Sequence, residues 1–166
     1  MIDFELEKKK DEIRGKALRK ISFSQKTEKE MRAYLIELGY SEDLVEDTVS
    51  FLKDFKYIND ISYAASFYRR EKGKMKGIRR IESELLKKGI SKSDIEKAFM
   101  DMEDDEDSGF EPDIVTARKL KDKMVREQLA MGKDLDDRFK SRVMRRLMSK
   151  GYDTGTCYRM LGEIKK

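Results

Sequence analysis

The chain has 166 residues and a mass of 19.6 kDa, with 43% charged and 38% hydrophobic residues, one proline and no tryptophan. This composition favours long solvated helices over a sheet sandwich with many turns, so we expect an all-α protein. Because histidine is absent and Cys157 is the single cysteine, zinc fingers, catalytic triads, Cys–His nucleophile pairs and internal disulfides are excluded.

The formal net charge of +4 hides long blocks of one sign. Residues 69–88 carry +6, residues 101–113 carry −8 and residues 114–166 carry +8. Such blocks suit a polyanionic or charge-patterned partner, although basic faces also simply keep helical proteins soluble. No segment approaches the roughly 20 consecutive apolar residues of a membrane span, and the N-terminus lacks the pattern of a signal peptide. We therefore expect a cytoplasmic protein without a membrane anchor.

Taken in chain order, the apolar periodicity predicts a short N-terminal extension followed by three tandem three-helix repeats. The expected ranges are 1–10 for the extension, 11–57 for the first repeat, 58–107 for the second, which ends in an acidic linker, and 108–166 for the third. Pro112 marks the start of the third repeat, because its missing N–H has no cost in the first turn of a helix. Helical repeats of this kind form an elongated, curved chain with a concave side for a large partner.

Three glycines set the register of the repeats. Gly39, Gly89 and Gly151 each end a helical segment, with an apolar residue four positions earlier (Leu35, Leu85, Leu147) and another eight positions earlier (Met31, Ile81, Val143). A good N-cap follows two residues later (Ser41, Ser91, Asp153), so one helix ends and another begins within about three residues. Core positions then recur at helical spacing: Val45, Val49 and Leu52; Ile95, Phe99 and Met102; Cys157, Leu161 and Ile164.

Several residues have both a functional and a structural interpretation. The turn around Gly73–Gly77 lacks the spacing of a Walker loop, and we interpret it as a flexible inter-helix turn; the alternative is a basic loop in which Lys74 and Lys76 bind phosphates. Cys157 occupies a core column, so we expect a buried thiol. The acidic run after Asp101 lacks the glycine and glutamate of a calcium loop and is interpreted as a solvated linker. Aromatic rings lie near the basic block at 69–72, namely Tyr57, Tyr63, Phe67 and Tyr68; we expect most to be core and one or two to be free for stacking on single-stranded nucleic acid.

Three segments carry a resemblance to a known family. They are Ala17-Leu18-Arg19 leading through Thr27, Glu28, Glu30 and Met31 to Gly39-Tyr40; Phe51 to Asp60, containing Tyr57-Ile58-Asn59-Asp60, followed by Tyr63-Ala64; and Lys76 to Ile81 with Glu84-Leu85 and Lys88-Gly89-Ile90. With these segments the chain resembles the bacterial RecX family of recombination regulators over roughly residues 15–166, most strongly in the first two repeats.

The resemblance implies a non-enzymatic modulator of the RecA recombinase. Such a protein binds the RecA–DNA filament along its groove and, as the expected direction, inhibits ATP hydrolysis, strand exchange and co-protease activity. It implies three tandem three-helix repeats and no catalytic residue, cofactor or metal. We expect a monomer whose partners are the RecA filament and single- or double-stranded DNA.

Charge alone selects the candidate contact residues. They are Arg69, Arg70, Lys72, Lys74, Lys76, Arg79 and Arg80 in the second repeat, and Arg118, Lys119, Arg142, Arg145 and Arg146 in the third. Two other classes stay open: a helix-turn-helix protein that binds DNA without a partner, and a scaffold that binds an unrelated protein. Sequence-specific duplex binding would favour the first of these.

Overall fold

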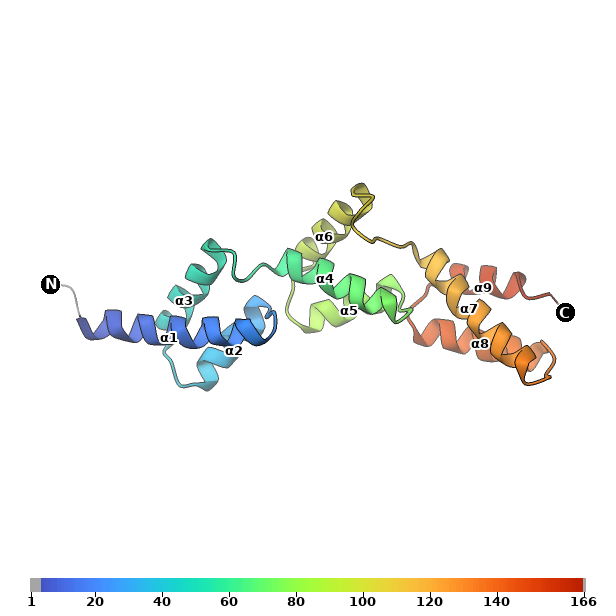
Figure 1. The fold of residues 1–166 in the computed structure, drawn as a ribbon, viewed down its shortest axis with the longest axis horizontal. Coiled ribbons are helices and arrows are strands. Elements are labelled where there is room, and N and C mark those ends of the chain that lie inside the picture. Colours follow the sequence, from blue (N-terminus) through green and yellow to red (C-terminus); the bar gives the residue numbers. More distant parts are fainter. Residues whose placement is uncertain (1–3, 166) are drawn as a thin grey trace. The chain divides into compact units, whose positions relative to one another are not determined.

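The computed structural model describes residues 4–165, and within that range the chain forms nine α-helices and no strand (Figure 1). The helices are α1 (Phe4–Phe23), α2 (Glu28–Glu37), α3 (Glu42–Asp54), α4 (Asp60–Gly73), α5 (Ile78–Lys87), α6 (Lys92–Asp104), α7 (Asp113–Ala130), α8 (Asp137–Ser149) and α9 (Thr154–Gly162). The predicted all-α class is therefore confirmed. None of these helices combines the length and the apolar character that crossing a membrane requires.

The helix boundaries agree with the glycine register. Gly39, Gly89 and Gly151 follow the ends of α2, α5 and α8 with φ of +86°, +86° and +90°, a conformation that side chains other than glycine adopt only at a cost. Two predicted N-caps also form, because Ser91 and Asp153 accept hydrogen bonds from the amides of Asp94 and Thr156. Ser41 precedes α3 with extended backbone, but its exposed side chain makes no capping bond.

The first helix includes most of the predicted N-terminal extension. Helix α1 begins at Phe4, so the described part of the predicted extension is already helical; residues 1–3 lie outside the described residues. Helix α7 begins at Asp113, so Pro112 is its N-cap rather than a residue of its first turn, and α6 extends into the acidic run as far as Asp104.

The described residues fall into two compact units. We call them the N-terminal unit, which extends to Ala65 and includes Leu85–Ala98, and the C-terminal unit, which comprises Ser66–Glu84 and the chain from Phe99 onward. This division passes through α4 and α5 and does not test the repeat boundaries, which stay predictions.

Each unit contains one complete three-helix core. In the N-terminal unit, α1, α2 and α3 pack together around Ile13, Ala17, Met31, Leu35, Val45, Val49, Leu52 and Ile58. In the C-terminal unit, α7, α8 and α9 enclose Ala117, Leu120, Phe139, Val143, Leu147, Tyr152, Cys157, Met160 and Ile164. The predicted core columns of these two helix groups are therefore buried, except that Leu161 is partly buried at the edge of the C-terminal core. Cys157 is a fully buried free thiol, as expected.

Each unit contains a similar hydrogen-bonded contact between the start of one helix and the end of another, which we call a joint. In the N-terminal unit, the Thr27 hydroxyl before α2 donates to the carbonyl of Lys88 after α5 at 2.9 Å. In the C-terminal unit, the Gly77 amide before α5 donates to the carbonyl of Lys150 after α8 at 2.8 Å. Thr27 and Gly77 both stand twelve residues before a corner glycine, so the second joint repeats the first in sequence register.

An aspartate completes each joint. The first amide of α2, at Glu28, donates to the Asp60 carboxylate at 3.0 Å, and the first amide of α5, at Ile78, donates to the Asp113 carboxylate at 3.0 Å. Asp60 and Asp113 are the first residues of α4 and α7. Each therefore satisfies an amide that the helix itself leaves without a partner, and its negative charge suits the positive end of the helix dipole.

Candidate functional site

All twelve basic residues selected from the sequence lie in the C-terminal unit. Arg69, Arg70 and Lys72 lie on α4, Lys74 and Lys76 in the following turn, Arg79 and Arg80 at the start of α5, Arg118 and Lys119 on α7, and Arg142, Arg145 and Arg146 on α8. The structure separates them into residues with internal partners and residues whose charge is uncompensated.

Lys72 is an internal residue. Its side chain is 3% exposed, forms an ion pair with Asp113 and donates to the Thr116 hydroxyl at 3.3 Å. Burial lowers the pKa of Lys72, and the hydrogen bond to Asp113 opposes that shift. Because Asp113 also caps α5, this lysine stabilises the joint and is not available to a partner on the surface.

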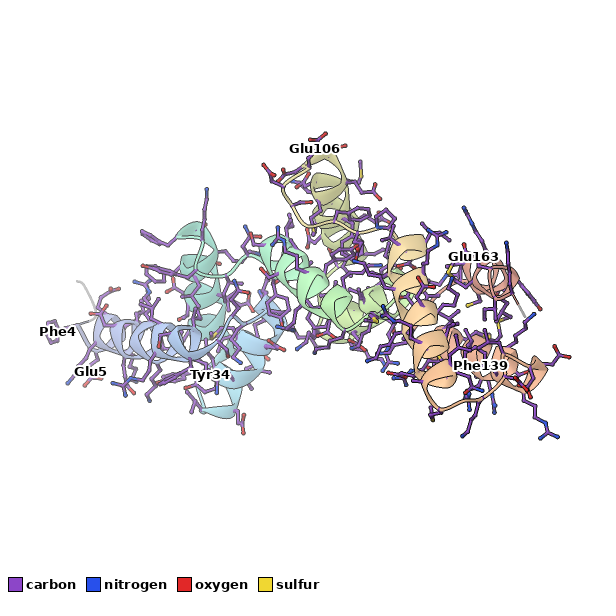
Figure 2. The ribbon with its side chains drawn as sticks, turned by 45° about the vertical axis from the view of Figure 1, so that its right-hand side comes forward. Phe4, Glu5, Tyr34, Glu106, Phe139 and Glu163 are labelled. Atoms are coloured by element: carbon purple, nitrogen blue, oxygen red, sulfur yellow. The ribbon has the colours of Figure 1, made fainter. Side chains whose placement is uncertain are left out.

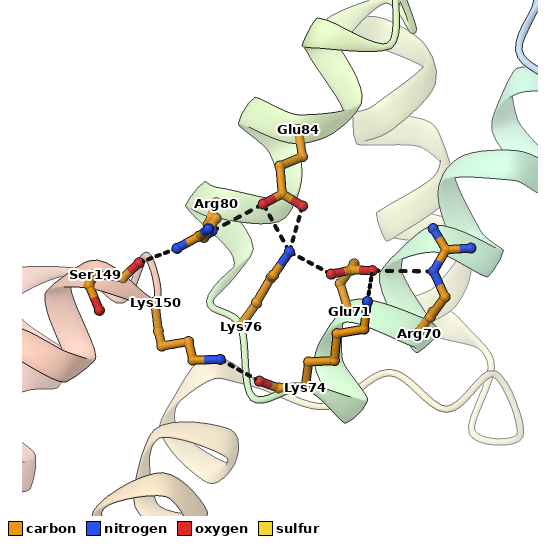
Figure 3. A network of polar contacts seen from close by, with 8 residues as sticks. All are labelled: Arg70, Glu71, Lys74, Lys76, Arg80, Glu84, Ser149 and Lys150. Carbon is orange, nitrogen blue, oxygen red and sulfur yellow. Dashed lines mark hydrogen bonds and ion pairs between the residues drawn. The ribbon is translucent and has the colours of Figure 1, made fainter.

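The turn that connects α4 to α5 is organised around the buried carboxylate of Glu71 (Figure 3). Lys74 donates to Glu71 at 2.8 Å, Lys76 lies 2.5 Å from its other oxygen, and Arg70 donates at 3.2 Å. Burial alone would raise the pKa of Glu71, but these three cations overcome that effect and hold the pKa at about 2. The predicted inter-helix turn is therefore present, and both of its lysines, Lys74 and Lys76, already bind the carboxylate of Glu71.

This pKa predicts an acid-sensitive stability. Glu71 titrates near 4.5 in the unfolded chain and at about 2 in the folded one, so its stabilisation is complete above pH 4.5 and is lost as the pH falls toward 2. We expect Glu71→Gln to lower the free energy of unfolding at neutral pH by about 2 kcal/mol, and to lose less stability than the unmodified chain between about pH 6 and pH 3. Urea unfolding followed by circular dichroism at about pH 6 and about pH 3 measures these free energies of unfolding.

Glu127→Gln is the matched control, because Glu127 is exposed and its nearest cation, Lys123, is 3.9 Å away. If Glu71→Gln and the unmodified chain lose the same free energy of unfolding as the pH falls, Glu71 is not the source of the acid sensitivity.

Lys76 and Arg80 extend the network towards α8. Lys76 donates to both oxygens of Glu84, at 2.9 and 2.7 Å, and Arg80 donates to Glu84 at 3.0 Å. Arg80 also donates to the carbonyl of Ser149 at 2.5 Å, in the last turn of α8 (Figure 3). A cation at this position satisfies a carbonyl that α8 leaves without a helical partner.

Four further predicted residues have local acceptors. Arg69 donates to the carbonyl of Ser108 at 2.5 Å, and Lys119 pairs with Glu111. Arg118 donates to both oxygens of Glu163, which is labelled in Figure 2. Arg118 and Lys121 hold the pKa of Glu163 at about 2. Arg142 donates to the Gln128 side chain at 2.6 Å.

The outward side of α8 carries four arginines, which we call the arginine face: Arg138, Arg142, Arg145 and Arg146. Their spacing of three and four residues places them on one side of the helix. Phe139, Val143 and Leu147 face the core, and Figure 2 shows Phe139 beside α7. Among residues 4–165, Arg138, Arg145 and Arg146 have no ion-pair partner, and the same holds for the exposed Arg79 on α5.

Two residues of this surface were not predicted from the sequence. Arg138 belongs to the arginine face, and its four-residue spacing from Arg142 is the signal that would have found it. Lys150 lies at the end of α8, where its ammonium donates to the carbonyl of Lys74 at 2.9 Å. Nothing in the sequence places Lys150 beside residue 74.

Two of the four aromatic residues near the basic block are internal. Tyr68 is fully buried, stacks on Phe110 with 5.4 Å between ring centroids, and donates to the carbonyl of Glu111. Phe67 is also buried, whereas Tyr63 is partly buried and Tyr57 is half exposed. Two of the four predicted rings are therefore core, and the prediction that one or two are free for stacking stays a prediction.

Comparisons with known proteins identify the family. The family model described as RecX, first three-helix domain, matches residues 14–52, and the one described as RecX, second three-helix domain, matches residues 59–98. The regulatory protein RecX of Clostridium perfringens (strain 13 / Type A) is 32% identical over 156 residues, which cover 90% of this chain and 68% of that protein.

Two solved structures have the same fold. A crystal structure of regulatory protein RecX covers 93% of this chain and 73% of its own, with a TM-score of 0.74 and 26% identity. The crystal structure of RecX from Lactobacillus salivarius covers 93% and 95%, with a TM-score of 0.73 and 23% identity. The sequence match and the shared fold together show that the chain belongs to the RecX family.

Proposed function

We propose that this protein regulates homologous recombination by binding RecA–DNA filaments, with inhibition of RecA ATP hydrolysis, strand exchange and co-protease activity as the expected direction. Membership of the RecX family carries the proposal, because the relatives bear the name of a regulatory protein. The arginine face supports it, since a filament that contains DNA presents phosphates to a cationic partner.

Regulation of this kind needs only a difference in affinity. A filament changes its conformation as ATP turns over, and a protein that binds one conformation more tightly holds the filament in it. Uncompensated arginines such as Arg138 and Arg145 are suited to this task, because their guanidinium groups reach a polyanion without first breaking an internal ion pair. Lys72, by contrast, is no longer among the proposed contacts.

Reversal of charge on the arginine face tests the proposal. We expect Arg138→Glu combined with Arg145→Glu to raise the concentration needed for half-inhibition of the single-strand-DNA-dependent ATPase of RecA by at least about tenfold. The log–log salt dependence of filament binding should fall by about one unit for each phosphate that the variant no longer neutralises. The measurement is a titration of RecA from the same organism at two salt concentrations.

Lys123→Glu combined with Arg126→Glu on α7 is the matched control, because it changes the net charge equally at exposed positions outside α8. Equal effects of the two double variants would reject the arginine face as the contact. No effect of the unmodified chain on the ATPase would reject the proposed function. In that case intact DNA binding would favour a partner-independent DNA-binding protein, and its absence a scaffold.

A further inference from the structure

The place where the turn before α5 meets the end of α8 concentrates positive charge. We call it the cationic corner and define it by Lys74, Lys76, Arg80 and Lys150, which Figure 3 shows, together with Arg146 one turn before Lys150 on α8. The two backbones touch here, since the Gly77 amide donates to the Lys150 carbonyl and the Tyr152 hydroxyl donates to the Met75 carbonyl, at 2.8 and 2.9 Å. The joint therefore brings the turn that carries Lys74 and Lys76 next to the end of α8, which carries Lys150.

The carboxylates of the corner are already fully engaged. Glu84 accepts from Lys76 and Arg80, and Glu71 accepts from Lys74 and pairs with Lys76. Arg70 adds a further cation to Glu71. Two carboxylates thus face six cations, and neither of them forms an ion pair with Arg146 or Lys150 within the described residues.

Arg146 and Lys150 lie four residues apart and therefore on the same side of α8. Within the described part of the chain, Arg146 has no ion pair, and the one acceptor of the Lys150 ammonium is the neutral carbonyl of Lys74. Burial lowers the pKa of Lys150, and the neighbouring cations Arg146, Arg80 and Lys76 lower it further, while Glu71 opposes these effects only in part. A neighbouring anion would relieve that repulsion.

We propose that the cationic corner binds a phosphate group, held by the Lys150 ammonium and the Arg146 guanidinium with Lys74 at its rim. A phosphate offers several oxygens and up to two negative charges, which suits donors that converge from different elements better than one carboxylate does. Because Lys150 also donates to the turn, the bound anion reinforces the contact between the turn and α8. This site concerns the isolated chain and does not depend on RecA.

Titration with inorganic pyrophosphate, followed by calorimetry and by the backbone amide resonances of Gly77 and Gly151, tests the proposal. We expect saturable binding that shifts both amides. Arg146→Met and Lys150→Met should each weaken it by about tenfold or more, whereas Arg126→Met should not change it. Arg126 is exposed on α7 and lies 13 residues from Asp113 at the joint, about 20 Å along the helix.

The Arg146 variant keeps the folded structure intact for this test, because the Arg146 side chain makes no hydrogen bond within residues 4–165. Lys150→Arg keeps the positive charge, so it should bind pyrophosphate almost as tightly as the unmodified chain does and more tightly than Lys150→Met. A short oligothymidylate identifies the source of the phosphate: weaker binding in the same two variants indicates a nucleic-acid backbone, and unchanged binding indicates free phosphate.

Three results would overturn the proposal. They are the absence of saturable pyrophosphate binding, an equally weakened binding in Arg126→Met, and tighter binding of a glutamate-rich peptide of matched charge than of pyrophosphate. The last result would assign the corner to an acidic protein segment. None of these measurements contains RecA, so their failure is distinguishable from failure of the proposed function.

Discussion

Replacement of Gly77 by alanine is expected to destabilise the C-terminal unit by about 3 kcal/mol. A methyl group at this position would lie 2.5 Å from the carbonyl oxygen of Gly151 and 2.8 Å from the amide nitrogen of Tyr152. Both are backbone atoms of the corner after α8, so the clash is relieved only if the turn and α8 move apart. That movement would also lengthen the hydrogen bond from the Gly77 amide to Lys150. Urea unfolding gives the change in free energy, and amide hydrogen exchange at residue 77 locates it.

Gly162→Ala is the control for this prediction. Gly162 ends α9 in the same unit, and a methyl group there meets no atom within 4 Å. Because alanine is the better helix former, the expected change is a small stabilisation, below about 1 kcal/mol. Similar free energies of unfolding in the Gly77 and Gly162 variants would mean that the joint does not hold the two backbones in contact.

Removal of the Asp113 carboxylate is the second change for which we expect a large effect. In Asp113→Ala, the buried ammonium of Lys72 loses its counter-ion and the amide of Ile78 loses its acceptor. Breaking a buried pair in this way costs about 3–5 kcal/mol, because the remaining charge stays away from water without compensation. Chemical denaturation measures the destabilisation, and hydrogen exchange at Ile78 should show that the start of α5 opens first.

The double variant Lys72→Met with Asp113→Ala separates the two contributions. It removes the buried charge and leaves only the missing cap, so it should recover most of the stability, to within about 1 kcal/mol of the unmodified chain. Glu127→Ala, at an exposed pair with Lys123, should change the stability by less than about 0.5 kcal/mol. If the double variant is no more stable than Asp113→Ala, the buried charge is not the cause.

The features that the sequence predicted correctly have local causes. A corner such as that at Gly151 is set by a positive φ that glycine adopts without strain, and the burial of Cys157 follows from its place in a helical apolar column. These signals depend on residues within one or two turns. They predicted the helical class, the positions of the corners and the core of the first and last helix groups.

The partners of the charged residues were not predictable in this way. Lys72 was assigned to a surface because it stands in a basic run, but its counter-ion is Asp113, 41 residues further along the chain. Lys150 meets the turn at Lys74 across an even longer separation. Charge counted along the sequence does not distinguish an internal ion pair from a free cation, since that difference arises only when distant helices pack.

The two joints also bear on how such a chain can change in length. Both joints share an aspartate at the first position of the incoming helix, a glycine at the following corner and a carbonyl that accepts one hydrogen bond, although the donor is the Thr27 hydroxyl in one and the Gly77 amide in the other. Duplication or excision of a whole helix triplet in frame would leave those elements in place at the new border. We therefore expect hybrid chains that exchange a helix triplet between relatives to fold when the border falls just before Asp60 or Asp113, which circular dichroism and urea unfolding of the hybrids would measure.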